Sequence, residues 1–205
     1  TSSRADRAAE RVDQRDDFLR RIRAERVVRD FAADFRSKSG RIRSLILNAD
    51  LIELNATPCM LTVGIDITER RRQERMQAAT YQISQVILGG GDLSALFAEV
   101  HRIIAELMPA KNCYFSLLSA DRSILSFPYF VDETMIHPEP RPPRNGVTEF
   151  VINSGEPLRA TDAEIVARLN TTGGYIPTGD PCAQWLGAPL MENGRGFGVV
   201  AVQDY

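Results

Sequence analysis

The sequence predicts an α+β fold in which two units are joined by a helix. Residues 27–67 and 112–205 contain short runs where apolar and polar side chains alternate, the period of a half-buried strand. Residues 13–27 and 68–108 instead repeat apolar side chains every three or four positions, the period of an amphipathic helix. Because short turns join the strands of the first set, that unit is expected to form an antiparallel meander.

The first unit, residues 1–67, is expected to be a helix followed by three strands. A helix is predicted over 13–27, with Asp13 as its candidate N-cap. Strands are predicted at 27–36, 41–54 and 59–67, separated by the turns SKSG and NATP. Each strand has an apolar face, formed respectively by Phe31, Ala33 and Phe35; by Leu45, Leu47, Ala49 and Leu51; and by Cys59, Leu61, Val63, Ile65 and Ile67.

A connecting helix is predicted over residues 68–91. Its first turns carry four arginines, and the sequence GGG at 89–91 ends it. Between these limits four apolar residues recur at three-four-three spacing, as in a coiled-coil seam: Met76, Ala79, Ile83 and Val86. The seam predicts a homodimer through this helix. The alternative is that the helix packs on its own sheet.

The second unit, residues 92–205, is expected to mix helices and strands around a central antiparallel sheet. Asp92, Thr148 and either Thr161 or Asp162 are candidate N-caps of its helices, and Gly155 is a candidate helix end. Helices are predicted at 93–108, 149–154 and 161–170, and strands at 112–119, 124–132 and 157–160. A proline-rich loop is predicted at 137–146. The unit is expected to end in a hairpin at 183–205 whose turn is the sequence ENGRG.

Composition and charge exclude several classes of protein. The net charge is −2 at pH 7, and the N-terminal arginines are interleaved with acids, which is typical of a solvated helix face and not of a nucleic-acid binder. No apolar run has the length of a membrane-spanning helix. The three cysteines have no CxxC or zinc spacing, so reduced thiols and a cytoplasmic location are expected. The chain opens on Thr, and a longer parent protein could still be membrane-anchored.

The first unit resembles the C-terminal half of a PAS sensor domain. The resemblance lies in FAADFRSKSGRIRSLILNADLIEL and in PCMLTVGIDITERRRQERM, where a meander closes on the sequence DIT and leads into a charged helix. A full PAS domain has about 100 residues, within the small-domain range. The resemblance therefore implies a partial PAS domain at residues 1–67, without the opening elements that build most of a PAS ligand pocket.

The second unit resembles a GAF domain along its whole length. The matching segments are ISQVILGGGDLSALFAEVHRIIAELMPAKNCYFSLLS, LSFPYFVDE, NGVTEFVINSGEPL and QWLGAPLMENGRGFGVVAVQDY. The resemblance implies a GAF domain at 92–205, with 77–91 as its first helix and the usual final helix missing. The GAF domains that this unit resembles are those found in bacterial sensor histidine kinases and cyclic-di-nucleotide signalling proteins. The resemblance thereby implies a sensory module that binds a small ligand of unknown identity or a partner, and a downstream output domain.

Candidate ligand-pocket residues follow from the resemblance and from the placement of aromatic side chains. They are Phe115, Tyr129, Phe150, Asp162 and Trp185, with Thr172 and Thr178 as further polar candidates. Each aromatic residue could instead be simple core. No catalytic set, cofactor or metal site is evident, because His101 and His137 have no partner ligands nearby in the sequence.

Three other readings of the second unit stay open at this point. A GAF-fold reductase of free methionine sulfoxide would use cysteine redox chemistry, but that family carries Cys where this chain has Thr148, and Cys182 has no evident resolving partner. A cyclic-nucleotide site is only loosely echoed by the sequences KN at 111–112 and DE at 132–133. A ligand-free dimerisation scaffold is the third reading.

The junction between the first sheet and the connecting helix is predicted to carry the signal. Asp66 lies between Ile65 and Ile67, so its carboxylate points away from their face, where it can pair with an arginine or accept N–H bonds at the helix start. Thr68 is a candidate cap of that helix, with Arg71 placed for a side-chain contact. The resemblance to PAS domains implies that the exit sequence transmits a conformational change.

Overall fold

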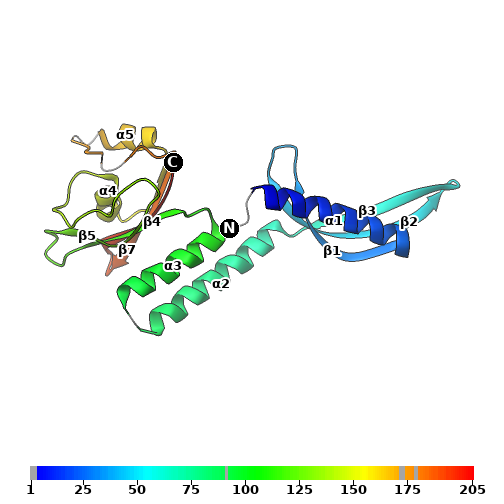
Figure 1. The fold of residues 1–205 in the computed structure, drawn as a ribbon, viewed down its shortest axis with the longest axis horizontal. Helices are drawn as coiled ribbons and strands as arrows, with labels where there is room; N and C mark the ends of the chain where they lie inside the picture. The colour runs from blue at the N-terminus through cyan, green and yellow to red at the C-terminus, as the bar shows by residue number, and fades with distance from the viewer. Residues whose placement is uncertain (1–3, 91, 171–173, 178–179) are drawn as a thin grey trace. The chain divides into compact units, whose positions relative to one another are not determined.

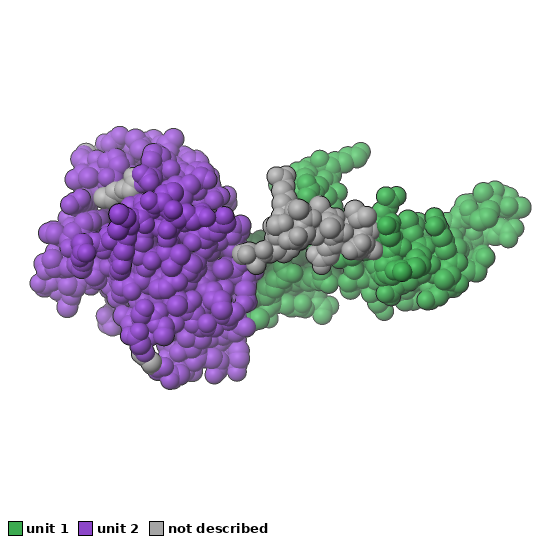
Figure 2. All heavy atoms as spheres, in the orientation of Figure 1, with its two compact units in different colours: residues 1–78 green, residues 79–205 purple. Residues whose placement is uncertain are grey.

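The computed structural model describes residues 4–90, 92–170, 174–177 and 180–205, with side chains from residue 14 onward. The chain divides into two compact units, residues 1–78 and 79–205, each with its own buried clusters (Figures 1 and 2). The mixed helix and strand content and the two antiparallel sheets confirm the predicted α+β class.

The first unit consists of a helix and a three-stranded meander. Helix α1 spans Arg4–Glu25, and the strands β1 (Val27–Arg36), β2 (Ile42–Leu54) and β3 (Thr57–Asp66) pair in the order β1-β2-β3. Both pairings are antiparallel, as the short turns predicted. The helix begins nine residues before Asp13, so the prediction that Asp13 is its N-cap is wrong. Asp13 is an interior residue because the helical segment extends upstream of the apolar stripe from which its start was inferred.

One face of this sheet is packed against α1. Phe18 and Ile22 of the helix form a buried cluster with Val28, Leu47 and Ala49 of the strands. The predicted face of β2, from Leu45 to Leu51, is this covered face. Residues opposite one another in an antiparallel pair point to the same side.

The apolar face of β3 is the other, uncovered face. Gly64 pairs with Leu47 and Thr62 with Ala49, so these residues of β3 point toward α1. The alternate residues Leu61, Val63 and Ile65 therefore point away from α1, and their exposed fractions are 54%, 57% and 54%. The alternation in β3 is real, but in the part of the chain that the structure describes its apolar residues remain exposed.

Helix α2, Thr68–Leu88, follows β3 directly and begins at the predicted residue. Of the four predicted seam residues, Ala79 is buried, Ile83 and Val86 are half-buried, and Met76 is exposed. Within the described residues, no helix combines the length and apolar character that crossing a membrane requires.

The second unit is a five-stranded antiparallel sheet with helices on both faces (Figure 1). The strands β4 (Asn112–Leu118), β5 (Leu125–Val131), β6 (Leu158–Ala160), β7 (Gln184–Glu192) and β8 (Arg195–Asp204) lie in the order β5-β4-β8-β7-β6. Helix α3 (Leu93–Leu107) covers one face through Phe97, which stacks on Phe115 at 4.3 Å between ring centroids. Helices α4 (Val147–Ser154) and α5 (Asp162–Asn170) cover the other face.

Local signals account for several boundaries in this unit. The β7–β8 hairpin turns at Asn193 and Gly194, which both have positive φ, as expected of an Asn-Gly turn. Gly155 ends α4 at φ 67°, and its N–H donates to the carbonyl of Val151.

The predicted caps of the helices have different outcomes. Thr161 and Glu164 form a reciprocal capping box at the start of α5, so Thr161 is the cap. Asp92 occupies the N-cap position of α3 without a side-chain capping bond, and Gly146 occupies that of α4. The prediction that Thr148 caps α4 is therefore wrong. This threonine lies inside the helix and is buried.

Candidate ligand site

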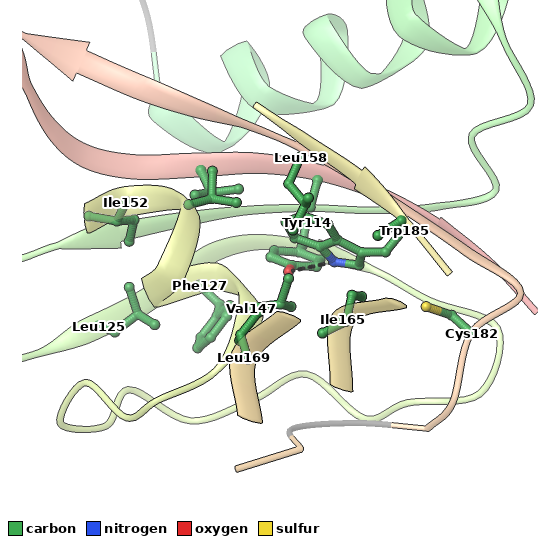
Figure 3. Close-up of a cluster of buried hydrophobic side chains, with 14 residues drawn as sticks. Tyr114, Leu125, Phe127, Val147, Ile152, Leu158, Ile165, Leu169, Cys182 and Trp185 are labelled. Atoms are coloured by element: carbon green, nitrogen blue, oxygen red, sulfur yellow. Dashed lines mark hydrogen bonds between the residues drawn. The ribbon is translucent and has the colours of Figure 1, made fainter. Parts of the chain in front are cut away.

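A cavity of about 650 Å³ lies in the second unit between the sheet and its α4/α5 cover. The strands β4, β5 and β7 supply its floor, and α4, α5 and residues of the segments 135–144, 175–177 and 180–182 supply its walls. Figure 3 shows the buried cluster of this unit, in which Tyr114 and Trp185 lie side by side on the sheet, with Ile165 and Leu169 of α5 facing them. A volume of this size suits a small organic molecule.

Hydrogen bonds fix the polar part of the floor. The indole N–H of Trp185 donates to the hydroxyl of Tyr114 at 3.2 Å (Figure 3). This hydroxyl is bonded to that of Thr148 at 2.9 Å. Burial raises the pKa of Tyr114 to about 12, so the phenol is neutral at physiological pH. These hydrogen bonds connect the three elements β4, β7 and α4 and hold the three side chains in place.

A buried ion pair forms one wall. Arg141 Nη1 lies 2.7 Å from Glu149 Oε1, and these side chains are only 15% and 5% exposed. The same carboxylate oxygen also accepts the backbone N–H of Arg144 at 2.8 Å. Breaking such a pair by removing one partner typically costs about 3–5 kcal/mol, because a charge is left buried without compensation. The guanidinium of Arg141 therefore stabilises the fold through its ion pair with Glu149.

Acidic side chains gather at the rim. Asp162 at the start of α5, Glu139 and Asp180 all line the cavity. Desolvation raises the pKa of Tyr175 and the pKa of Cys182, and the negative charge of Asp162 acts in the same direction on both. Arg144 is the second arginine in the lining.

Of the five aromatic and acidic residues predicted to line the pocket, the structure brings Asp162 and Trp185 to the cavity. Phe115 and Tyr129 are directly paired neighbours on β4 and β5, and they pack toward α3 on the opposite face. Neither residue lines this cavity. Tyr114 is next to Phe115 on β4, so its side chain points to the opposite face of the sheet, where the cavity lies. Tyr114 pairs with Phe130, which also lines the cavity.

The remaining candidates lie elsewhere. Phe150 packs at the edge of the core beneath the guanidinium of Arg168, at 5.5 Å from the ring centroid, and lines a smaller hollow beside α4. It does not line the main cavity. Thr172 and Thr178 lie outside the described residues.

Sequence reasoning missed Tyr114, Thr148 and the Arg141–Glu149 pair. Alternation along the strand predicts that Tyr114 points to the opposite face from Cys113 and Phe115. The sequence does not show which face of the sheet holds the cavity. Glu149 is an acid beside the apolar run of a short helix, and such a residue is ordinarily exposed. Only the folded chain shows that it is buried.

The thiols and imidazoles have structural surroundings. The three cysteines are free thiols, and the two in this unit belong to separate buried clusters on opposite faces of the sheet, Cys113 toward α3 and Cys182 beside the cavity. His101 bonds the hydroxyl of Tyr129 and the carbonyl of Ala110, while His137 bonds the carbonyl of Phe127. The described residues contain no group of three or more His, Cys, Asp or Glu arranged for a metal ion.

A second constellation lies at the β3–α2 junction inside the first unit. Asp66 accepts from the backbone N–H of Thr68 at 3.0 Å and from its hydroxyl at 2.6 Å, and pairs with Arg43 at 2.5 Å. Both kinds of contact predicted for Asp66 are present. The oxygen of Thr68 accepts the backbone N–H of Ser44 on β2, so Thr68 ties the helix start to the sheet and does not cap the helix. Arg71 lies 3.8 Å from Asp34 and not against Thr68.

The second unit is thus an antiparallel sheet with helices on both faces and a cavity under two short helices, of a size that suits small ligands. The family model of the GAF domain matches residues 92–205, and the chain therefore belongs to the GAF domain family. No curated protein matches the chain in sequence.

Solved structures are similar to this chain at low sequence identity. The GAF domain of a phosphoenolpyruvate-protein phosphotransferase from Coxiella burnetii is 18% identical with a TM-score of 0.50, over 64% of this chain and 78% of that one. The GAF domain of the Acinetobacter phosphoenolpyruvate-protein phosphotransferase is 15% identical with a TM-score of 0.48, over 64% and 77%. A free methionine-R-sulfoxide reductase from Neisseria meningitidis, in complex with its substrate, is 16% identical with a TM-score of 0.49, over 65% and 75%.

Proposed function

We propose that this chain is a sensory and regulatory module whose GAF domain binds a small molecule in the cavity between the sheet and α4/α5. The observation that carries the proposal is the cavity itself, about 650 Å³ in volume, with an aromatic floor pinned by the Trp185–Tyr114–Thr148 hydrogen bonds. Such a preformed site needs little reorganisation to bind.

The first unit is proposed to be the C-terminal half of a PAS domain, and α2 the helix that carries its signal. The three-stranded antiparallel meander that ends at Asp66 supports this assignment, as does the bonding of Asp66 and Thr68 to both the sheet and the helix start. A helix held this way moves with the strands that hold it, which is what a transmitting element requires.

The module is proposed to act as a homodimer in the cytoplasm, within a two-component or cyclic-di-GMP signalling protein that carries its own output domain. Several large apolar side chains of α2 remain exposed, among them Tyr81, Ile87 and Leu88, and these support a helix-mediated dimer. Nucleic-acid and direct membrane binding are not part of the proposal.

The chain itself is proposed not to be an enzyme. A reductase of free methionine sulfoxide needs a nucleophilic thiolate and a positioned resolving thiol. Burial and the nearby Asp162 raise the pKa of Cys182, which is the direction that disfavours a thiolate, and Cys113 lies on the other face of the sheet. A Cys182→Ser variant that lost a measurable methionine sulfoxide reductase activity would contradict this part of the proposal.

The sensor proposal is tested by thermal shift and native mass spectrometry across a metabolite panel. Val166 lines the cavity from α5 and is half-buried, so Val166→Trp is expected to fill the cavity and abolish the response to any ligand that binds there. Ala167→Trp places the same side chain at the neighbouring exposed position and is the matched control. A ligand response that survives Val166→Trp, or a panel without any response, contradicts the proposal.

A further inference from the structure

We infer that the cavity in the GAF domain takes a small organic cation, an ammonium group attached to an apolar body. This inference rests on the proposed function and assigns the ligand class of the same site. The physical basis is the balance of charge in the lining and the nature of the surfaces between the charges.

The charges in the lining are predominantly negative. Glu139, Asp162 and Asp180 line the cavity, and none of the three makes an ion pair or hydrogen bond with another described residue. The described lining contains two arginines, and Arg144 is the one whose guanidinium forms no ion pair with a described residue. Three carboxylates against one guanidinium favour a cationic ligand, since each acid can supply a charge-assisted hydrogen bond.

The other arginine is not available to an anionic ligand. Arg141 is engaged by Glu149 at 2.7 Å and also donates to the carbonyl of Pro142 at 3.1 Å. If a phosphate or carboxylate took this guanidinium, the carboxylate of Glu149 would be left buried without its cation. Its second oxygen already has no hydrogen-bond partner among the described residues. The wall therefore disfavours anions even though it contains an arginine.

The surfaces between these charges are aromatic. Five aromatic side chains line the cavity: Tyr114, Phe127, Phe130, Tyr175 and Trp185. The faces of aromatic rings attract cations, and desolvation within a cavity strengthens that attraction. Tyr175 and Asp162 both line the cavity, so the lining offers a ring and a carboxylate to the same ligand. An ammonium group bound there would satisfy the carboxylate while its apolar body lies over the floor.

Three probes with the same body test the charge preference: phenethylammonium, phenethyl alcohol and hydrocinnamate. Their affinity for the whole chain is measured by isothermal titration and by the fluorescence of Trp185, the single tryptophan. Phenethylammonium is expected to bind most tightly and hydrocinnamate least. Asp162→Asn is expected to weaken phenethylammonium binding by roughly tenfold or more, with a smaller effect on the alcohol. Glu156→Gln, an exposed acid outside the lining, is the matched control and should change neither affinity.

Two kinds of result overturn the inference, and they separate it from the proposed function. If hydrocinnamate binds as tightly as phenethylammonium or more so, the charge preference is wrong while a small-molecule site remains. If phenethylammonium does not bind, or if Asp162→Asn weakens the alcohol as much as the ammonium, the cation assignment is wrong. The sensor proposal is then decided by the metabolite panel and Val166→Trp, which presuppose no ligand charge.

Discussion

Asp66 is the residue at which the first sheet becomes a helix. The hydroxyl of Thr68, its backbone N–H and the guanidinium of Arg43 together lower the pKa of Asp66 to about 2. The folded pKa lies below the unfolded value of about 3.9, so the ionised form stabilises the fold. That contribution is fully present above about pH 4 and is lost as the pH falls through about 2.

Asp66→Asn is therefore expected to destabilise the first unit at neutral pH, with a smaller difference from the parent below pH 2 or so. Carbon-13 NMR of the carboxyl groups measures the titration directly, and melting curves across pH measure the stability. Asp16→Asn, at an exposed acid of α1, is the control and should have little effect. An Asp66 carboxyl that titrates near 4 would show that the contacts seen here do not persist in solution.

Gly187 gives the indole of Trp185 its place on β7. A Cβ atom at Gly187 would lie 2.1 Å from the indole Cη2, far inside van der Waals contact. Gly187→Ala is expected to displace the ring from the cavity floor, to cost about 1–3 kcal/mol as an overpacked position, and to shift the emission of the single tryptophan to longer wavelength.

Fluorescence and thermal unfolding measure both effects. Gly89→Ala, where the nearest atom to a new Cβ is 3.4 Å away, is the matched glycine control. Unchanged emission in Gly187→Ala would mean that the indole is not held against this glycine.

At the scale of the element, α2 is the helix through which we expect copies of the chain to associate. Of the predicted seam residues, Ala79, Ile83 and Val86 are buried or half-buried, and Met76 is exposed. Tyr81 and Leu88 are seven positions apart, so they lie on one side of the helix, and Leu88 is 80% exposed. We expect a second copy to pack against this side and not against the buried seam residues.

Leu88→Glu is expected to weaken a homodimer, since it places a charge in an apolar interface. Sedimentation equilibrium over a range of concentrations measures the dissociation constant. Gln82→Glu adds the same charge at an exposed polar position of α2 and should leave the constant unchanged. A dimer equally stable in both variants, or a parent chain that stays monomeric, contradicts association through this face.

Element boundaries were predictable where one local rule operates alone. The Asn193-Gly194 turn, the end of α4 at Gly155 and the start of α2 at Thr68 follow from residues that act on their own backbone. Thr148 shows where local rules fail. Its hydroxyl is hydrogen-bonded to that of Tyr114, a residue 34 positions away. The helix begins before Thr148, and Gly146 occupies the N-cap position.

At the scale of the whole molecule, two units each contain their own core. Phe18, Ile22 and Leu47 belong to the cluster of the first unit, and Leu125 to the largest cluster of the second. Ile22→Ala is expected to cost about 2–5 kcal/mol in the first unit, and Leu125→Ala a similar amount in the second.

Amide hydrogen exchange separates these effects. Ile22→Ala should accelerate exchange in β1 and β2 more than in β4 and β8, and Leu125→Ala should do the reverse. The two variants serve as controls for each other. Equal acceleration in both sheets by either variant would show that the units unfold as one.

The sequence by itself determined the α+β class, the positions of nearly all strands and helices, and the family of residues 92–205. These follow from periodicity and turn chemistry, which act over a few neighbouring residues. Only the tertiary structure decided that Tyr114 and not Phe115 faces the cavity, that Glu149 is buried against Arg141, and that the apolar face of β3 is uncovered. Each of these depends on which side of a sheet a distant helix covers, and alternation along a strand defines two faces without saying which one will be buried.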